Sequence, residues 1–144
     1  MSRDPRYDVL FEPVTIGPVT APNRFYQVPH CSGMGYSLPK TLAAMRGTKA
    51  EGGWGVVCTE YCSIHPTSDD TPFPHATLWD DEDVRSHALM CEQVHAHGSL
   101  AGVELWHGGR GSANLLSREI PIGAASMPVG KPHSAQTRAM DKDD

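Results

Sequence analysis

The residues best suited to chemistry lie in residues 24–35, where a short apolar stretch leads into a cysteine. The stretch is aromatic and β-branched, as is typical of a strand, and Pro29 ends it because proline has no backbone donor. Cys31 follows at once, where a parallel strand presents side chains to a ligand. The glycines at 33 and 35 let the backbone pass close to a bulky group. The segment therefore predicts a reaction site with a thiol, although a buried, inert cysteine would fit the same pattern.

Two further stretches, residues 54–61 and 100–106, are mostly apolar and predict parallel strands buried on both faces. The first ends in Tyr61, and the second ends in Trp106 and is followed by His107. Because the carboxyl ends of parallel strands meet at one edge of a sheet, we expect these side chains to lie near the cysteine.

Helices are predicted between these strands. Residues 42–52 form one helix that Thr41 can cap, and a second helix begins after Asp80 and ends before Gly98. The second helix starts with acidic residues, which suit the positive end of the helix dipole and which we expect to be solvated. Its apolar stripe is expected to contain four residues: Val84, Ala88, Cys91 and Val94.

The remaining segments predict connections. Residues 14–16 and 23–28 are extended runs separated by a Gly-Pro pair, which predicts an amino-terminal hairpin that leads into the first core strand. Residues 62–79 hold prolines and polar residues and predict a loop long enough to be functional. Residues 112–144 show no periodicity.

The alternation of strands and helices predicts an α/β fold built on a parallel sheet. A doubly wound dinucleotide-binding sheet shares this order, but the G-x-G of residues 33–35 lacks the third glycine of that fingerprint. We therefore expect the amino-terminal part of a (β/α)8 TIM barrel, with about three β/α units after the hairpin. Since eight strands need roughly 200 residues, we expect residues 1–144 to be an incomplete barrel domain, and the chain to be a fragment.

Composition limits the partners. The net charge is -5 and the basic residues are scattered, which argues against nucleic-acid binding. The sequence has no apolar run of membrane-spanning length and no secretory signal, so we expect no membrane partner and a cytoplasmic location with reduced cysteines. Cys58, Cys62 and His65 could suggest zinc, but no second ligand pair follows, so we interpret both cysteines as core residues and expect no metal site.

Four motifs, in order, resemble the trimethylamine dehydrogenase family, a group of Old Yellow Enzyme-like flavoproteins that includes dimethylamine and histamine dehydrogenases. The motifs are RFYQVPHC at 24–31, KAEGGW at 49–54, TEYCSI at 59–64 and AGVELW at 101–106. The resemblance covers about residues 3–118. It implies the amino-terminal part of an FMN-binding TIM barrel of the NADH:flavin oxidoreductase/NADH oxidase type. In the family, a 4Fe-4S cluster and nucleotide-binding domains follow the barrel, and all of these are expected in the missing part.

Carried over residue by residue, the resemblance implies that Cys31 forms the 6-S-cysteinyl bond to FMN. Tyr61 matches an aromatic residue of the substrate site, where its ring would attract an alkylammonium by a cation–π interaction. Glu104 matches the position that faces the pyrimidine edge of the flavin. Three residues are implied to lie with their backbone along the flavin ring: Val28, Pro29 and His30.

The implied activity is oxidation of a small, trimethylamine-like amine, by N-demethylation or deamination, to an aldehyde and a shortened amine. The implied partners are the amine, an electron-transfer flavoprotein or similar acceptor, and a second copy in a homodimer. The family's catalytic and phosphate-binding groups would follow Asp144, so no catalytic residue is assigned in this sequence and the fragment is expected to be inactive alone. His107 stands where trimethylamine dehydrogenases have a tyrosine, which leaves the identity of the amine open.

Two alternative functions remain at this point. One is an Old Yellow Enzyme-type ene-reductase that takes electrons from a nicotinamide, although Cys31 and Tyr61 favour the amine enzyme. The other is a non-catalytic zinc or thiol module, which a flavin absorption spectrum and metal analysis would distinguish from a flavoprotein.

Overall fold

The computed structural model describes residues 4–69, 75–130 and 135–144. Its main elements are β1 (Val14–Ile16), β2 (Val19–Ala21), β3 (Tyr26–Gln27), α1 (Pro39–Glu51), β4 (Val56–Ser63), β5 (Ala76–Thr77), α2 (Asp81–His95) and β6 (Leu100–Trp106). Shorter elements are the 3-10 helices η1 (Pro5–Phe11), η2 (Pro66–Ser68) and η3 (Gly109–Gly111), and strands β7 (Ile122–Gly123) and β8 (Arg138–Ala139). The predicted order of strand, helix, strand, helix and strand is confirmed by β3, α1, β4, α2 and β6.

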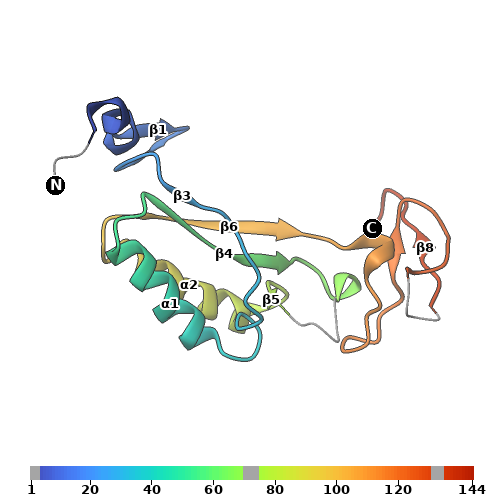
Figure 1. The fold of residues 1–144 in the computed structure, drawn as a ribbon. Helices are drawn as coiled ribbons and strands as arrows, with labels where there is room; N and C mark the ends of the chain where they lie inside the picture. The colour runs from blue at the N-terminus through green and yellow to red at the C-terminus, as the bar shows by residue number, and fades with distance from the viewer. Residues whose placement is uncertain (1–3, 70–74, 131–134) are drawn as a thin grey trace.

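Strand β4 lies at the centre of a parallel sheet. β3 pairs with its first residues, β5 pairs with its last residues, and β6 runs along its opposite edge. Helices α1 and α2 lie side by side on one face of this sheet, and the β1–β2 hairpin lies beyond the end where the strands begin (Figure 1). Parallel strands alternating with helices that cover one face form part of a TIM barrel, which confirms the predicted α/β class.

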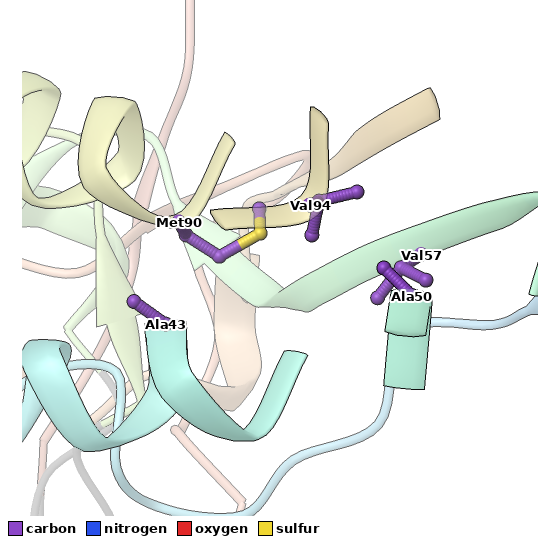
Figure 2. Packing of buried hydrophobic residues seen from close by; sticks show 5 residues of the cluster. All are labelled: Ala43, Ala50, Val57, Met90 and Val94. Atoms are coloured by element: carbon purple, nitrogen blue, oxygen red, sulfur yellow. The ribbon is translucent and has the colours of Figure 1, made fainter. Parts of the chain in front are cut away.

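The main core lies between the helices and β4, as Figure 2 shows. It consists of five buried side chains: Ala43, Ala50, Val57, Met90 and Val94. Gly47 of α1 faces Gln93 of α2, and an added Cβ at that position would lie only 3.3 Å from the Gln93 Cβ. Gly47 therefore lets the two helices approach closely.

Helix α1 begins at Pro39, earlier than the predicted residue 42. Leu38 is its N-cap and makes no side-chain cap hydrogen bond, so the expected cap by Thr41 was wrong. Proline suits the first helical position because the N–H groups there have no partner within the helix. Strand β4 also starts and ends later than the predicted residues 54–61. The predicted loop at 62–79 contains η2 and β5, and residues 70–74 of it lie outside the described residues.

Helix α2 begins as predicted, with the Asp80 side chain accepting hydrogen bonds from two backbone N–H groups of the first turn. Its apolar stripe was predicted wrongly in its first half, since Val84 and Ala88 are both exposed whereas Met90, which was not in the stripe, is buried. The first turn faces polar groups instead of the core. The Asp83 carboxylate accepts hydrogen bonds from the Thr77 hydroxyl and the Trp79 amide, so the acidic start is only partly solvated.

The amino-terminal hairpin differs from the prediction in its second strand. Val14 pairs with Ala21 in the antiparallel β1–β2 hairpin, which turns at Gly17 with a positive φ of 56°. A two-residue turn places residues 19–21 opposite β1, which leaves Tyr26 and Gln27 to pair with β4. The hairpin and the sheet enclose a second small cluster of buried residues: Ala21, Val56 and Cys58.

The outer side of β6 is only partly covered. Ala101 packs against the main core, but Val103 and Leu105, which share its face of the strand, are 41% and 64% exposed. Among the described strands, β4 alone pairs with β6. In a complete barrel a further helix and a further strand would cover these groups.

Close packing at Gly102 leads to a stability prediction. An added Cβ at Gly102 would overlap the Cys58 Sγ, because the two residues face each other across β4 and β6. Gly102→Ala is expected to lower the free energy of unfolding by about 1–3 kcal/mol, the usual cost of overpacking. Urea unfolding of the protein that carries this sequence measures the change. Gly111→Ala serves as the control because nothing lies within 4 Å of its added Cβ.

The double variant Cys58→Ala/Gly102→Ala removes the overlapping sulfur. It is expected to be at least about 1 kcal/mol more stable than the sum of the two single changes predicts, because contacting residues are energetically coupled. Additive effects of the two substitutions would contradict the proposed overlap.

Candidate functional site

The face of the sheet opposite the helices carries a row of candidate side chains. Gly102 faces Cys58, so Glu104 and Trp106, two and four residues further along β6, lie on the same face. The Cys58 thiol also contacts the Tyr26 hydroxyl of β3 at 3.1 Å. This surface is referred to below as the inner face, because it would point to the axis of a complete barrel.

An irregularity in β4 brings Tyr61 to the inner face. The register with β6 shifts between Cys58, which pairs with Gly102, and Tyr61, which pairs with Glu104. The extra residue reverses the alternation of side chains, so that Tyr61 lies on the same face as Cys58. Without this shift Tyr61 would point toward the helices.

Tyr61 lies in a group of three rings. Its ring centroid is 4.6 Å from that of His75 in an edge-to-face arrangement, and 4.6 Å from that of Trp106 at an interplanar angle of 36°. From the sequence, Trp106 was expected only to lie at the same sheet edge as Cys31, and His75 had no expected role. Trp106 could have been found from its spacing, since it follows Glu104 by two residues, but nothing in the loop sequence around His75 indicates its position.

Cys31 follows β3 at the carboxyl edge of the sheet and is exposed. The Glu60 carboxylate, which is fully buried, accepts hydrogen bonds from the Ser32, Met34 and Gly35 backbone N–H groups at 2.6, 3.2 and 3.1 Å. It also accepts one from the Ser32 hydroxyl. Burial raises the pKa of Glu60, but the hydrogen bonds from the loop outweigh this effect and the net shift is downward, so the group is ionised at neutral pH.

Arg46 of α1 holds the other side of the same loop. Its buried guanidinium donates hydrogen bonds to the His30 carbonyl at 2.8 Å and to the Gln27 side-chain oxygen at 3.1 Å. It also lies 3.0 Å from the His30 Nδ1. Burial and the nearby Arg46 charge lower the pKa of His30, which leaves Nδ1 able to accept a hydrogen bond from Arg46.

The three residues whose backbone was predicted to lie along a flavin ring differ in their hydrogen bonds and in their exposure. The His30 carbonyl is engaged by Arg46, and the Val28 carbonyl accepts a hydrogen bond from the Gln27 side chain. The Val28 side chain is 59% exposed at the edge of the inner face, and Pro29 is half-buried beside it. A role for the backbone of these residues stays a prediction.

His107 lies in a separate polar chain between two loops. The Gly109 N–H donates to its Nδ1 at 3.1 Å, which places the ring proton on Nε2, 3.1 Å from the Thr67 hydroxyl. The hydroxyl in turn lies 2.8 Å from the His65 Nδ1. Burial, together with the neighbouring His65, lowers the pKa of His107. His107 therefore ties the loop after β6 to the loop after β4.

The other cysteines differ from Cys31 in their surroundings. Burial raises the pKa of Cys62 to about 11 and also raises the pKa of Cys58 and Cys91. These thiols stay protonated at neutral pH and are poor nucleophiles. The described part of the chain holds no group of three His, Cys, Asp or Glu side chains suited to a metal ion.

Within residues 4–69, 75–130 and 135–144, no helix is long and apolar enough to cross a bilayer.

Comparison with known proteins identifies relatives by sequence and by structure. The chain is 54% identical to dimethylamine dehydrogenase of Hyphomicrobium sp. (strain x) over 123 residues, which are 85% of this chain and 17% of that protein. The structure of histamine dehydrogenase from Rhizobium sp. 4-9 matches with a TM-score of 0.92 and 46% identity, over 96% of this chain and 20% of that one. The structure of 6-hydroxypseudooxynicotine amine oxidase from Pseudomonas geniculata N1 matches with a TM-score of 0.93 and 43% identity, over 99% and 21%.

The chain thus spans about a fifth of the length of these relatives. The matches confirm the predicted resemblance to the amino-terminal part of the trimethylamine dehydrogenase family, and they make the chain a homologue of flavin-dependent amine dehydrogenases. A broader family is matched by residues 9–144. The chain belongs to the NADH:flavin oxidoreductase / NADH oxidase family.

Proposed function

We propose that this chain supplies the first strands of an FMN-dependent amine dehydrogenase in which Cys31 carries the flavin covalently. The observation that carries the proposal is the placement of the exposed Cys31 at the carboxyl end of β3, beside an inner face that ends in the rings of Tyr61 and Trp106. The likeness to proteins named dimethylamine and histamine dehydrogenase supports the same class of activity.

The residues of the inner face fit a flavin. Tyr26 and Val28 are both about half exposed, so this face offers an apolar surface on which a flat ring system can lie. Glu104 is exposed on the same face, and its carboxylate is a suitable acceptor for the imide N–H of a flavin pyrimidine ring. Cys31 adds a nucleophilic sulfur at the edge of this surface.

Covalent attachment would form one bond and break two. The Cys31 sulfur forms a bond to C6 of the flavin while its S–H bond and the C6–H bond break. The two electrons and two protons released in this way would pass to dioxygen or another electron acceptor. A thioether at this position holds the cofactor in place and adjusts its reduction potential.

The bound flavin would supply a two-electron acceptor for the amine. The substrate loses a hydride equivalent from a carbon next to nitrogen, and water then hydrolyses the resulting iminium to an aldehyde and a shortened amine. Tyr61 and Trp106 contribute aromatic faces that attract an alkylammonium group, worth roughly 0.5–2 kcal/mol for a cation–π contact. We further propose that a 4Fe-4S cluster and an electron-transfer flavoprotein receive the electrons, in a cytoplasmic homodimer.

The first test concerns covalent attachment in the full-length protein that carries this sequence. Cys31→Ala is expected to abolish the covalent bond while the protein still folds and binds some FMN, because cofactor binding draws on many contacts besides one thioether. Intact mass after denaturation measures the attachment. Cys91→Ala, in α2 against the main core, is the control and should keep an FMN-sized mass increment. Release of all flavin from the denatured wild-type protein would refute the proposal.

The second test concerns Tyr61 and the amine. Tyr61→Ala is expected to raise the KM for a methylated amine by about 2- to 30-fold, the equivalent of one lost cation–π contact. Tyr61→Phe keeps the aromatic face and should stay within about twofold of wild type. Steady-state kinetics with the full-length enzyme provide the measurement, and equal KM values for the Ala and Phe variants would remove Tyr61 from the substrate site.

A further inference from the structure

We propose that Glu60 is the positioning residue for flavin attachment, because its buried carboxylate fixes the loop that presents the Cys31 sulfur. This inference rests on the proposed function, since it concerns the cofactor that Cys31 would carry. It assigns a role to a residue that neither the sequence motifs nor the strand pattern identified as part of the site.

Glu60 contacts the loop through both carboxylate oxygens. One oxygen accepts hydrogen bonds from the Ser32 and Met34 N–H groups, and the other accepts one from the Gly35 N–H. The His75 Nδ1 lies 4.0 Å from the carboxylate, and the Arg46 charge acts on Glu60 from farther away. Backbone N–H groups of the loop compensate most of the negative charge. The position of the loop therefore depends on where β4 places Glu60.

The two residues that flank Cys31 are both fixed by buried charges. His30 on one side accepts from Arg46 through its carbonyl, and Ser32 on the other side donates to Glu60 through its N–H and its hydroxyl. The Cys31 side chain nevertheless remains exposed. The backbone of the nucleophile is thus held on both sides while its sulfur can be reached by a ligand.

Such an arrangement matters for bond formation. A loop residue with an exposed side chain ordinarily samples many orientations, and holding a reacting atom in the productive one raises its effective concentration. Misplacement by about 1 Å can slow a reaction by as much as 100-fold. The carboxylate at position 60 would therefore control how fast the sulfur bonds to a flavin on the inner face more than how tightly the flavin binds.

Glu60→Gln is the informative substitution because it keeps the size of the side chain. Its amide has one acceptor oxygen, and its NH2 group would oppose one of the N–H donors that Glu60 satisfies. Either the Gly35 N–H group, or the Ser32 and Met34 N–H groups together, is expected to lose its acceptor while the remaining oxygen stays bound. Glu51→Gln, at the exposed end of α1, is the matched control that removes one charge without touching the loop.

The experiment uses full-length apoprotein reconstituted with FMN. Covalent attachment is followed by intact mass over time, and noncovalent affinity is measured by titration with FMN at early times. Glu60→Gln is expected to slow attachment by about tenfold or more, with an FMN Kd within about threefold of wild type. Glu51→Gln should match wild type in both measurements. Attachment by Glu60→Gln at the wild-type rate would overturn the proposal.

A second readout does not depend on flavin. Hydrogen–deuterium exchange of the peptide that covers residues 32–35 in apoprotein is expected to be faster in Glu60→Gln than in wild type, because N–H groups lose their acceptor. Unchanged exchange would also overturn the inference.

Where Glu60→Gln fails to fold, Ser32→Ala removes only the hydroxyl contact and should still slow attachment by about two- to fivefold, as expected for the loss of one hydrogen bond. Attachment by Ser32→Ala at the wild-type rate would then overturn the inference. A wild-type protein that never bonds flavin refutes the proposed function, which is a different result from equal rates in wild type and variant.

Discussion

Strand β4 is the constraint on which the other contacts depend. It is buried along nearly its whole length, and it pairs with β3 and β5 on one edge and with β6 on the other. Its first half follows the regular alternation, with Val57 in the core under the helices and Cys58 on the inner face. The register shift that follows turns the second half, which brings Tyr61 to Trp106 and Glu60 to the loop after β3. Such irregularities commonly redirect a side chain beside a functional site.

Two buried charges connect this strand and the first helix to the loop that carries Cys31. Arg46 and Glu60 are both fully buried. The Glu60 carboxylate accepts its hydrogen bonds from the loop, and Arg46 donates to His30 of the loop and to Gln27 of β3. A buried charge that loses its partners costs several kcal/mol, so the loop cannot leave either residue without a large loss of stability. The position of the thiol is consequently determined by the packing of the core.

The two sides of β6 differ in what covers them. Its inner side carries Glu104 and Trp106 toward the face proposed for the flavin, while Val103 and Leu105 on the outer side are left exposed. The first β/α units therefore present the proposed cofactor surface and the exposed Cys31 thiol, but the inner face is open on the side away from β4. Chemistry on an amine would need groups that close this face, which is consistent with the much greater length of the relatives.

The sequence by itself determined the alternation of strands and helices, the cap at Asp80 and the limits of β6, because these depend on local periodicity and capping chemistry. The motifs around Cys31, Tyr61 and Glu104 identified the family, although their roles remain proposals. Only the tertiary structure decided which residues of β4 face inward, since a register shift depends on the partner strand and leaves no mark in the local pattern. It also decided that Glu60 and Arg46 hold the loop, because contacts between residues far apart in sequence form only when the strand, helix and loop pack together.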